Sequence, residues 1–202
     1  MHELNDFYFC KTYELPFGFK TSNIELKELF KAWFVISLAF TFAFYGLNIG
    51  PSMLSFLLIS AFTVGFGFVL HELSHKIVAQ HYGAFAEFRA DNQMLALAII
   101  MSVFGFLFAA PGAVFIMGRV TRKQNGMISL AGPLSNFLLA LVFLFFNLFF
   151  PSLLFFYGFK INSWLALFNM LPFGNLDGSK VLNWNKRIYV FFIILFLITV
   201  FL

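Results

Sequence analysis

Long apolar stretches without any charge dominate the sequence. Four of them, residues 32–47, 52–70, 127–150 and 188–202, contain no Asp, Glu, Lys or Arg. A bilayer core about 30 Å thick is crossed by roughly 20 helical residues, so stretches of this length predict membrane-spanning helices. Only 11% of the residues are charged, whereas soluble domains have about a quarter. The chain is therefore predicted to be an integral membrane protein.

The predicted fold is an all-α integral membrane bundle of about five to six transmembrane helices, forming one membrane-embedded domain over residues 1–202. Two small β elements are expected beside the helices. One is a hairpin in the peripheral segment 1–30, where Pro16 and Gly18 favour a turn. The other is a membrane re-entrant loop that follows residue 83.

Charge and cysteine content exclude several classes of protein. The net charge of +4 is small, and the basic residues gather at the ends of the apolar stretches, which is typical of cytoplasmic loops and not of nucleic-acid binding. Cys10 is the only cysteine, so an internal disulfide and a cysteine-based zinc site are excluded. The first thirty residues mix charges with aromatic side chains, so we expect no cleavable signal peptide.

The order of the helices follows from breaks and caps. Ser22 or Asn23 is the expected N-cap of the first helix. A helix that began near Lys160 and stopped before Pro172 would be only about 18 Å long, which would leave Pro172 within the bilayer or the protein. The expected spans are residues 32–47, after a helix start over 24–31 on the cytoplasmic side, and residues 52–82, 127–150, 160–171 and 188–202.

Residues 94–117 allow two interpretations. The segment is apolar and long enough to span, but Arg89 precedes it and three basic residues follow it between 119 and 123. Positive charge at both ends favours two cytoplasmic ends. This pattern predicts a re-entrant hairpin or a sheet-like loop, with a break at Gly105 or at Pro111 and Gly112. A single ordinary helix is the alternative.

A metal-binding motif ends the second apolar stretch. The string His71-Glu72-Leu73-Ser74-His75 has the form HExxH. On a helix, its two histidines share one face about 6 Å apart and can reach one zinc ion, with Glu72 on the flank as general base. The alternative is an accidental polar cluster. Ionisable groups at the end of an apolar stretch are costly, which favours the zinc site.

A catalytic zinc site needs a third protein ligand. His81 is rejected, because a continuing helix places it about 9 Å beyond His75 along the axis. Asp177 is the only carboxylate in the sequence after Asp91, and it follows a helix break. It is therefore the candidate third ligand, and a helix cap for the residues that follow is its alternative role. Glu87 is expected to pair with Arg89 or to face water, as is Asp91.

Three patches resemble the site-2 protease family of intramembrane zinc metalloproteases: HELSH at 71–75, AGPLSN at 131–136 and NMLPFGNLDG at 169–178. The resemblance covers about residues 52–184, the expected catalytic core. It implies one zinc ion held by His71, His75 and Asp177, with Glu72 as general base. It also implies that Asn169 orients the scissile peptide or its oxyanion, with a helix–helix hydrogen bond as the alternative.

The resemblance has departures and further implications. The family often has prolines where this chain has Gly174 and Asn175, and the chain carries no PDZ or CBS module. The stretch after HELSH resembles the family's re-entrant β-loop, which can pair with an extended substrate. Ser135, Asn136 and Asn175 either line a water entry or make hydrogen bonds within the bundle.

The expected function is hydrolysis of peptide bonds within transmembrane segments, at a site near the cytoplasmic side of the cell membrane. The expected partners are a transmembrane protein substrate and the lipid bilayer, with no nucleic acid; the oligomeric state does not follow from the sequence. The alternatives are a membrane zinc protease that cuts at the cytoplasmic surface, a zinc or proton transporter that uses the same ligands, and an inactive zinc-binding relative.

Overall fold

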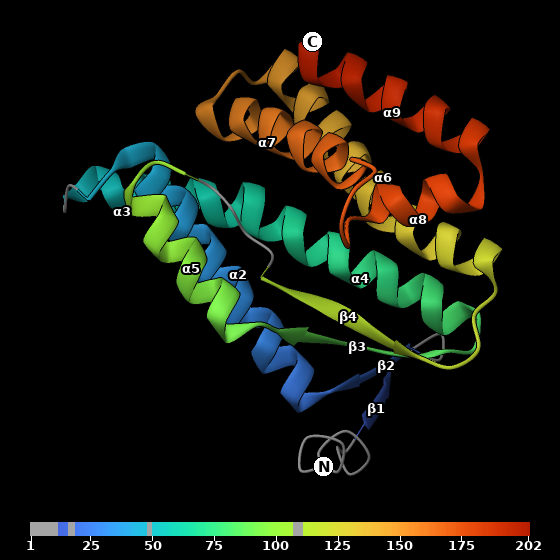
Figure 1. Cartoon of the computed structure of the whole chain (residues 1–202). Helices are drawn as coiled ribbons and strands as arrows, with labels where there is room; N and C mark the ends of the chain where they lie inside the picture. The colour runs from blue at the N-terminus through green and yellow to red at the C-terminus, as the bar shows by residue number, and fades with distance from the viewer. Residues whose placement is uncertain (1–11, 16–18, 48–49, 107–110) are drawn as a thin grey trace.

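The structure is a computed structural model that describes residues 12–15, 19–47, 50–106 and 111–202 (Figure 1). Most of these residues are helical. Helix α4 crosses the middle of the molecule, with α6 to α9 on one side of it and α2 and α5 on the other, and α3 lies at its N-terminal end (Figure 1). The four short strands lie along the remaining side of α4.

The first two long helices follow the sequence prediction. Helix α2 spans Asn23–Tyr45 and begins at the predicted N-cap, where Ser22 Oγ accepts a hydrogen bond from the backbone N–H of Glu25 at 3.1 Å. Helices α3 (Pro51–Ser60) and α4 (Phe66–His81) are joined by a π-helical turn, η2 (Ala61–Gly65). They form one apolar helix of 31 residues. The π-turn was not predicted, because one additional residue hardly alters an apolar pattern.

The strands form two antiparallel pairs. Strand β1 (Thr12–Leu15) pairs with β2 (Phe19–Ser22), which confirms the predicted N-terminal hairpin. Its predicted turn at Pro16 and Gly18 lies outside the described residues. Strand β3 (Phe85–Ala90) pairs with β4 (Gly112–Met117). The end of β4 therefore lies beside the beginning of β3.

The segment 94–117 is therefore not one helix. Helix α5 (Asn92–Val103) has only 12 residues, which reach about 18 Å. Gly105, with a φ of 78°, follows the end of this helix, and the chain then comes back as β4. The alternative of an ordinary spanning helix is wrong, and the second half of the segment is the sheet-like element that the charge pattern favoured. Its depth in a membrane stays a prediction.

The remaining helices are α6 (Arg122–Phe149), α7 (Leu153–Asn169), α8 (Asp177–Trp184) and α9 (Lys186–Phe201). The predicted start of α7 near Lys160 is wrong, because Ser152 caps the helix and α7 has 17 residues, about 25 Å. Lys160 is an internal residue of α7 whose ammonium reaches the carbonyl of Val200, 3.5 Å away. The short fourth span, on which the expected depth of Pro172 rested, is thus not observed.

In the part of the chain that the structure describes, three helices are long and apolar enough to cross a membrane: α2, the continuous α3–α4 helix, and α6. This agrees with an integral membrane protein. Helices α7 and α9 are shorter, with 17 and 16 residues, so a count of five to six spans stays a prediction. Large apolar side chains such as Phe145, Phe149 and Phe191 are exposed, as expected where lipid replaces water.

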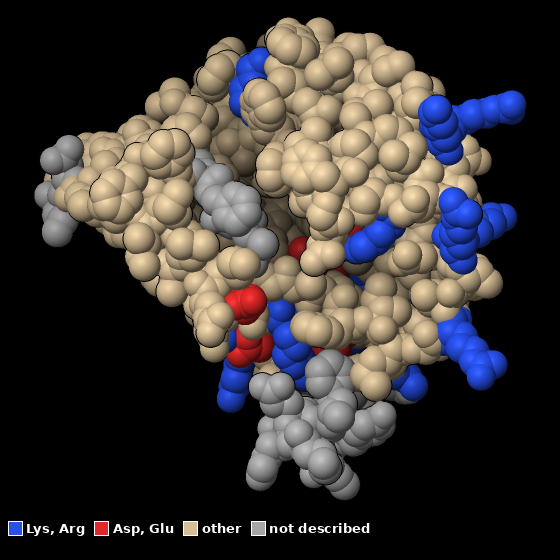
Figure 2. Space-filling view, viewed as in Figure 1, with Lys and Arg blue, Asp and Glu red and all other residues tan. Residues whose placement is uncertain are grey.

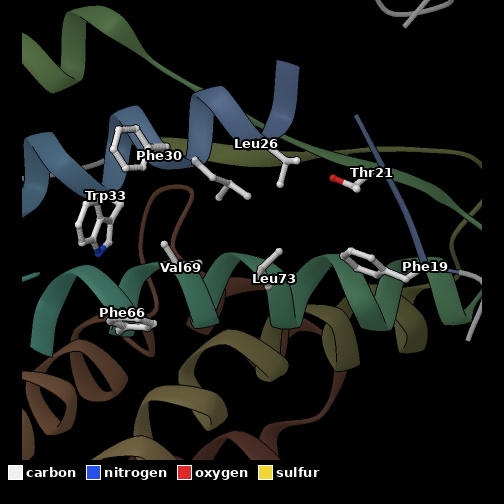
Figure 3. A pocket seen from close by; sticks show the side chains of 9 residues that line it. Phe19, Thr21, Leu26, Phe30, Trp33, Phe66, Val69 and Leu73 are labelled. Carbon is white, nitrogen blue, oxygen red and sulfur yellow. The ribbon is translucent and has the colours of Figure 1, made fainter. Parts of the chain in front are cut away.

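An apolar groove of about 460 Å³ lies between α2 and α4 (Figure 3). Phe30 and Trp33 face it from α2, and Val69 and Leu73 face it from α4. These two α4 residues each stand two positions from a motif histidine, so they lie on roughly the opposite side of the helix. The groove is therefore on the other side of α4 from the two motif histidines.

Candidate metal centre

Helix α4 directs both motif histidines toward α6. His71 and His75 are four residues apart on one helix face, and both are buried, with exposed fractions of 6% and 8%. Their ring centroids are 4.6 Å apart, and their Nε2 atoms are 3.0 Å apart. The two nitrogens therefore converge on one point.

The turn after α7 brings Asp177 to the same point. Its Oδ2 lies 3.2 Å from His71 Nε2 and 3.1 Å from His75 Nε2. Asp177 is the first residue of α8, with Leu176 in the cap position, so its carboxylate faces the imidazoles and does not cap the helix. A Cβ on the next residue, Gly178, would overlap the carbonyl of Met170. Glycine at that position lets the turn pack tightly enough to place the carboxylate.

Hydrogen bonds on the far side of each ring determine which nitrogen faces the centre. His71 Nδ1 is 2.7 Å from Asn136 Oδ1, and His75 Nδ1 is 2.7 Å from the carbonyl oxygen of Ile128. Both partners are acceptors, so each Nδ1 carries a proton and donates. In the neutral imidazoles, each Nε2 lone pair is then free to bind a metal.

The three convergent atoms fit a zinc ion. They form a triangle with sides of 3.0, 3.1 and 3.2 Å, and tetrahedral zinc with bonds of about 2.0–2.1 Å spaces its ligand atoms by roughly 3.3 Å. All three are acceptors whose electron pairs face one another, an arrangement that a cation between them relieves. His71, His75 and Asp177 form the group of three potential metal ligands found in the described part of the chain.

Helix α6 packs directly on this centre through Gly132. A Cβ at Gly132 would lie 2.6 Å from His71 Nε2 and closer still to His75 Nε2. The AGP part of the AGPLSN patch thus lets a helix backbone approach the two imidazoles.

The electrostatics of the centre favour an anionic Asp177. Burial raises the pKa of its carboxyl, whereas protonated His75 and His71 would outweigh burial and hold that pKa below its ordinary value, so a positive charge among the three groups keeps the carboxylate ionised. Lys180 lies one turn further along α8, with its Nζ 3.7 Å from Asp177 Oδ1. A carboxylate that stays ionised is a suitable ligand for a divalent cation.

Glu72 is buried beside this centre, with 9% of its surface exposed. The groups around its carboxyl are His71, Asp177, Lys180 and the backbone N–H of Val114 in β4. In the space-filling view, a hollow separates the part built on α2, α3 and α5 from the part built on α6 to α9 (Figure 2). Acidic side chains are visible in the floor of that hollow.

The other candidates are not members of the His–His–Asp cluster. Asn169 ends α7, is partly buried, and donates from Nδ2 to the carbonyl of Leu165 in its own helix at 3.0 Å. His81, rejected from the sequence, is exposed at the end of α4. Glu87 pairs with Arg89 at 2.9 Å, as predicted. Asp91 is exposed and caps α5.

The three residues predicted to line a water entry, Ser135, Asn136 and Asn175, lie in different environments. Asn175 is exposed, and Ser135 Oγ donates to the carbonyl of Gly132 at 2.7 Å. Asn136 is buried and accepts a hydrogen bond from His71, so of its two predicted roles it has the hydrogen bond within the bundle and not the lining of a water entry. Sequence reasoning did not single out Asn162, a fully buried neighbour of Asn136. The available signal was an amide in the middle of an otherwise apolar helix.

Two proteins of Methanocaldococcus jannaschii are similar to this chain. The one named "Putative zinc metalloprotease MJ0611" is 48% identical over 162 residues, which cover 77% of this chain and 82% of the relative. The one named "Zinc metalloprotease MJ0392" is 30% identical over 120 residues, which cover 57% of this chain and 30% of the relative. No family model and no solved structure matches the chain.

These relatives identify zinc as the metal for which the His–His–Asp cluster is suited. The match with the first relative extends over most of both chains. The chain therefore belongs to the same family of zinc metalloproteases as that relative.

Proposed function

We propose that this protein is an intramembrane zinc protease of the site-2 protease type, which hydrolyses peptide bonds within transmembrane segments of other membrane proteins. The observation that carries the proposal is the place of the centre. His71, Glu72 and His75 are buried on a helix of 31 residues that is long and apolar enough to cross a bilayer. A hydrolytic centre on such a helix is suited to substrates that are themselves in the membrane.

We place the centre near the cytoplasmic side. The helix that carries it ends at His81, about 9 Å beyond His75. Lys and Arg side chains lie along the edge of the molecule where α6 and α9 begin (Figure 2), and these include Arg122 and Lys186. Basic residues at helix ends are retained on the cytoplasmic side. Water reaches such a centre over a short path.

Each residue of the centre has a proposed role. His71, His75 and Asp177 hold the zinc ion. When bound, zinc supplies a Lewis acid that polarises a carbonyl and lowers the pKa of water. Glu72 takes a proton from the attacking water and delivers it to the nitrogen of the leaving amine. The burial of Glu72 keeps bulk water away from this proton transfer.

The edge of β4 is the proposed binding place for an extended substrate. The N–H of Phe88 in β3 donates to Glu25 Oε1 at 3.0 Å, so it points away from β4. Phe88 is paired with Val114, and both members of such a non-hydrogen-bonded pair direct their N–H and C=O groups outward. Val114 therefore directs its N–H outward from the β3–β4 pair, where it donates a hydrogen bond to the carboxylate of Glu72.

A substrate strand that paired with this edge would place its peptide groups next to the general base. The transmembrane segment of the substrate must first unwind locally, because in a helix its carbonyls are already used in hydrogen bonds of the helix itself. We assign Asn169 to the orientation of the scissile peptide or its oxyanion. The carbonyl of Leu165 is an intrahelical partner that Asn169 can exchange for substrate.

The test uses the purified full chain in lipid vesicles, with a peptide that spans the bilayer once. Wild-type protein with zinc is expected to cut the peptide within its apolar segment. The Glu72→Gln variant is expected to bind zinc equally well and to lose about 10²- to 10⁴-fold in cleavage rate. Cleavage confined to peptides outside the bilayer would indicate a surface protease. Zinc flux into the vesicles that Glu72→Gln leaves unchanged, without cleavage, would indicate a transporter.

A further inference from the structure

Two buried asparagines connect the metal centre to backbone carbonyls on other helices. His71 Nδ1 is 2.7 Å from Asn136 Oδ1 on α6, and Asn136 Nδ2 donates to Asn162 Oδ1 on α7 at 3.1 Å. Asn136 is 1% exposed and Asn162 is 0% exposed. We call the chain from Asn162 through Asn136 to His71 the asparagine relay.

The direction of every hydrogen bond in the asparagine relay is determined at its far end. Asn162 Nδ2 donates to the carbonyls of Gly158 at 2.9 Å and Thr63 at 3.4 Å. Backbone carbonyls only accept, so the amide nitrogen of Asn162 must face them. Its oxygen must then face Asn136 and accept from that side chain.

The same constraint passes to His71. Asn136 Nδ2 also donates to the carbonyl of Gly67 at 3.0 Å, so both of its protons point to acceptors, and its oxygen points to the imidazole. That oxygen only accepts, so His71 must carry its proton on Nδ1. The other nitrogen, Nε2, is left without a proton and faces the centre.

We propose that Asn136 and Asn162 are positioning residues of the zinc site, which hold His71 in the tautomer and ring orientation that bind the metal. This inference rests on the proposed assignment of His71, His75 and Asp177 as the zinc ligands. The asparagine relay acts on the empty site as well as on the loaded one, because all its hydrogen bonds lie within the chain. Groups that orient a ligand histidine are worth about 10- to 100-fold in metal affinity.

The packing around the relay is built to accommodate it. A Cβ at Gly67 would lie 3.3 Å from Asn136 Nδ2 and would overlap Asn162 Oδ1. Thr63, whose carbonyl accepts from Asn162, lies in the π-helical turn η2. Unpaired amides in apolar helices are costly. Two asparagines that only joined helices would not need to contact a histidine. Here the relay ends on Nδ1 of His71.

His75 provides an internal reference. Its Nδ1 hydrogen bonds to the carbonyl oxygen of Ile128, 2.7 Å away. That partner is backbone, so the tautomer of His75 is independent of Asn136. A change at Asn136 should therefore alter one imidazole and leave the other unchanged.

The experiment compares Asn136→Leu and Asn162→Leu with Asn147→Leu, in the full chain in detergent micelles. Asn147 lies on α6 and accepts only a 3.4 Å hydrogen bond from the N–H of Ser152. Zinc affinity is measured by competition with a chelator. Asn136→Leu is expected to weaken zinc binding about 10- to 100-fold, Asn162→Leu less, and Asn147→Leu not at all. Nitrogen NMR of the zinc-free protein should show that Asn136→Leu changes the tautomer of His71 but not that of His75.

Asn136→Asp is a second variant at the same position, which tests the inference if Asn136→Leu does not fold. Its carboxylate still accepts from Nδ1, so His71 should keep its Nδ1 proton. Because the carboxylate cannot donate to the Gly67 carbonyl or to Asn162 Oδ1, zinc affinity should fall between those of the wild type and Asn136→Leu. Wild-type affinity and an unchanged tautomer in Asn136→Leu would overturn the inference. So would an equal loss in the Asp and Leu variants.

A reference variant separates this inference from the proposed function. His71→Ala is expected to lose zinc. If it binds zinc like the wild type, the ligand assignment itself is wrong. If it loses zinc while Asn136→Leu does not, only the role of the asparagine relay is overturned. None of these measurements requires a substrate.

Discussion

Helix α4 carries two buried polar clusters that differ in one respect. On the side that faces α6, His71 and His75 meet Asp177, and three acceptor atoms converge within 3.2 Å of one another. About 100° further around the helix, Lys76 forms an ion pair with Glu25, and both side chains are 0% exposed. The first cluster has acceptors but no cation of its own between them, whereas the second contains its own cation.

The Lys76 cluster is satisfied within the chain. Glu25 also accepts from Thr21 Oγ1 at 2.7 Å and from the N–H of Phe88 at 3.0 Å, so it joins β2, α2, β3 and α4. The ammonium of Lys76 lies 4.5 Å from the ring centre of Phe19. Buried charges that are paired and hydrogen bonded contribute to a defined structure. We therefore expect the cluster that lacks a cation of its own to be the one that binds a metal ion.

The largest expected effect is on the cluster that lacks a cation. Asp177→Ala should abolish zinc binding and lower proteolytic activity roughly 10⁴-fold, equivalent to about 5.4 kcal/mol of transition-state stabilisation. The zinc-free protein should change in stability by no more than about 1 kcal/mol, since the ion pair that the carboxylate makes with Lys180 is 3.7 Å long and the lysine side chain is exposed. Metal analysis and denaturant unfolding with a chelator measure the two quantities. Undiminished zinc content in Asp177→Ala would contradict the comparison.

The Lys76 cluster should respond in the opposite way. Lys76→Met leaves Glu25 buried without its cation and should cost about 3–5 kcal/mol of unfolding free energy. The double variant Lys76→Met with Glu25→Gln should recover most of this loss, because the amide oxygen can still accept from Phe88. Zinc affinity should change only a few-fold in either variant. Equal unfolding free energies for the single and double variants would show that the pair does not act as a unit.

Sequence reasoning identified the centre better than its surroundings. HELSH and the isolated Asp177 were found because a motif and a lone carboxylate are visible in one dimension, and the structure places them together. The pairing of Glu87 with Arg89 and the cap at Ser22 were predicted because they are local. The ligand roles themselves stay predictions until metal binding is measured.

The misses have physical reasons. The predicted helix start near Lys160 is wrong because the long side chain of this lysine lets its ammonium reach the carbonyl of Val200 from within α7. The sequence does not single out Lys76, whose partner Glu25 is 51 residues away. Asn162 lies 99 residues from Thr63, whose carbonyl it contacts. Only tertiary packing reveals such pairs.

A smaller effect is expected from the close approach of α6 to the centre. Gly132→Ala should weaken zinc binding about 10-fold, equivalent to about 1.4 kcal/mol, because the added Cβ would lie 2.6 Å from His71 Nε2 and displaces the rings. Gly50→Ala is the matched control, since a Cβ there meets nothing within 4 Å. Chelator competition measures both. If Gly132→Ala binds zinc as tightly as Gly50→Ala, the packing of α6 does not shape the centre.

The smallest expected effect tests whether burial is what makes the Glu25–Lys76 pair strong. Glu28 lies one turn after Glu25 on α2 and pairs with Lys31 at 2.7 Å, but the side chains of Lys31 and Glu28 are 36% and 23% exposed. A double-mutant cycle on this pair should give a coupling energy of about 0–1 kcal/mol, whereas the same cycle on Glu25 and Lys76 should give several times more. Both cycles use a glutamate on the same helix and a lysine, so the charges are matched. Similar coupling energies would mean that the Lys76 cluster is an ordinary surface-type pair, and the distinction between the two sides of α4 would then rest on the metal centre alone.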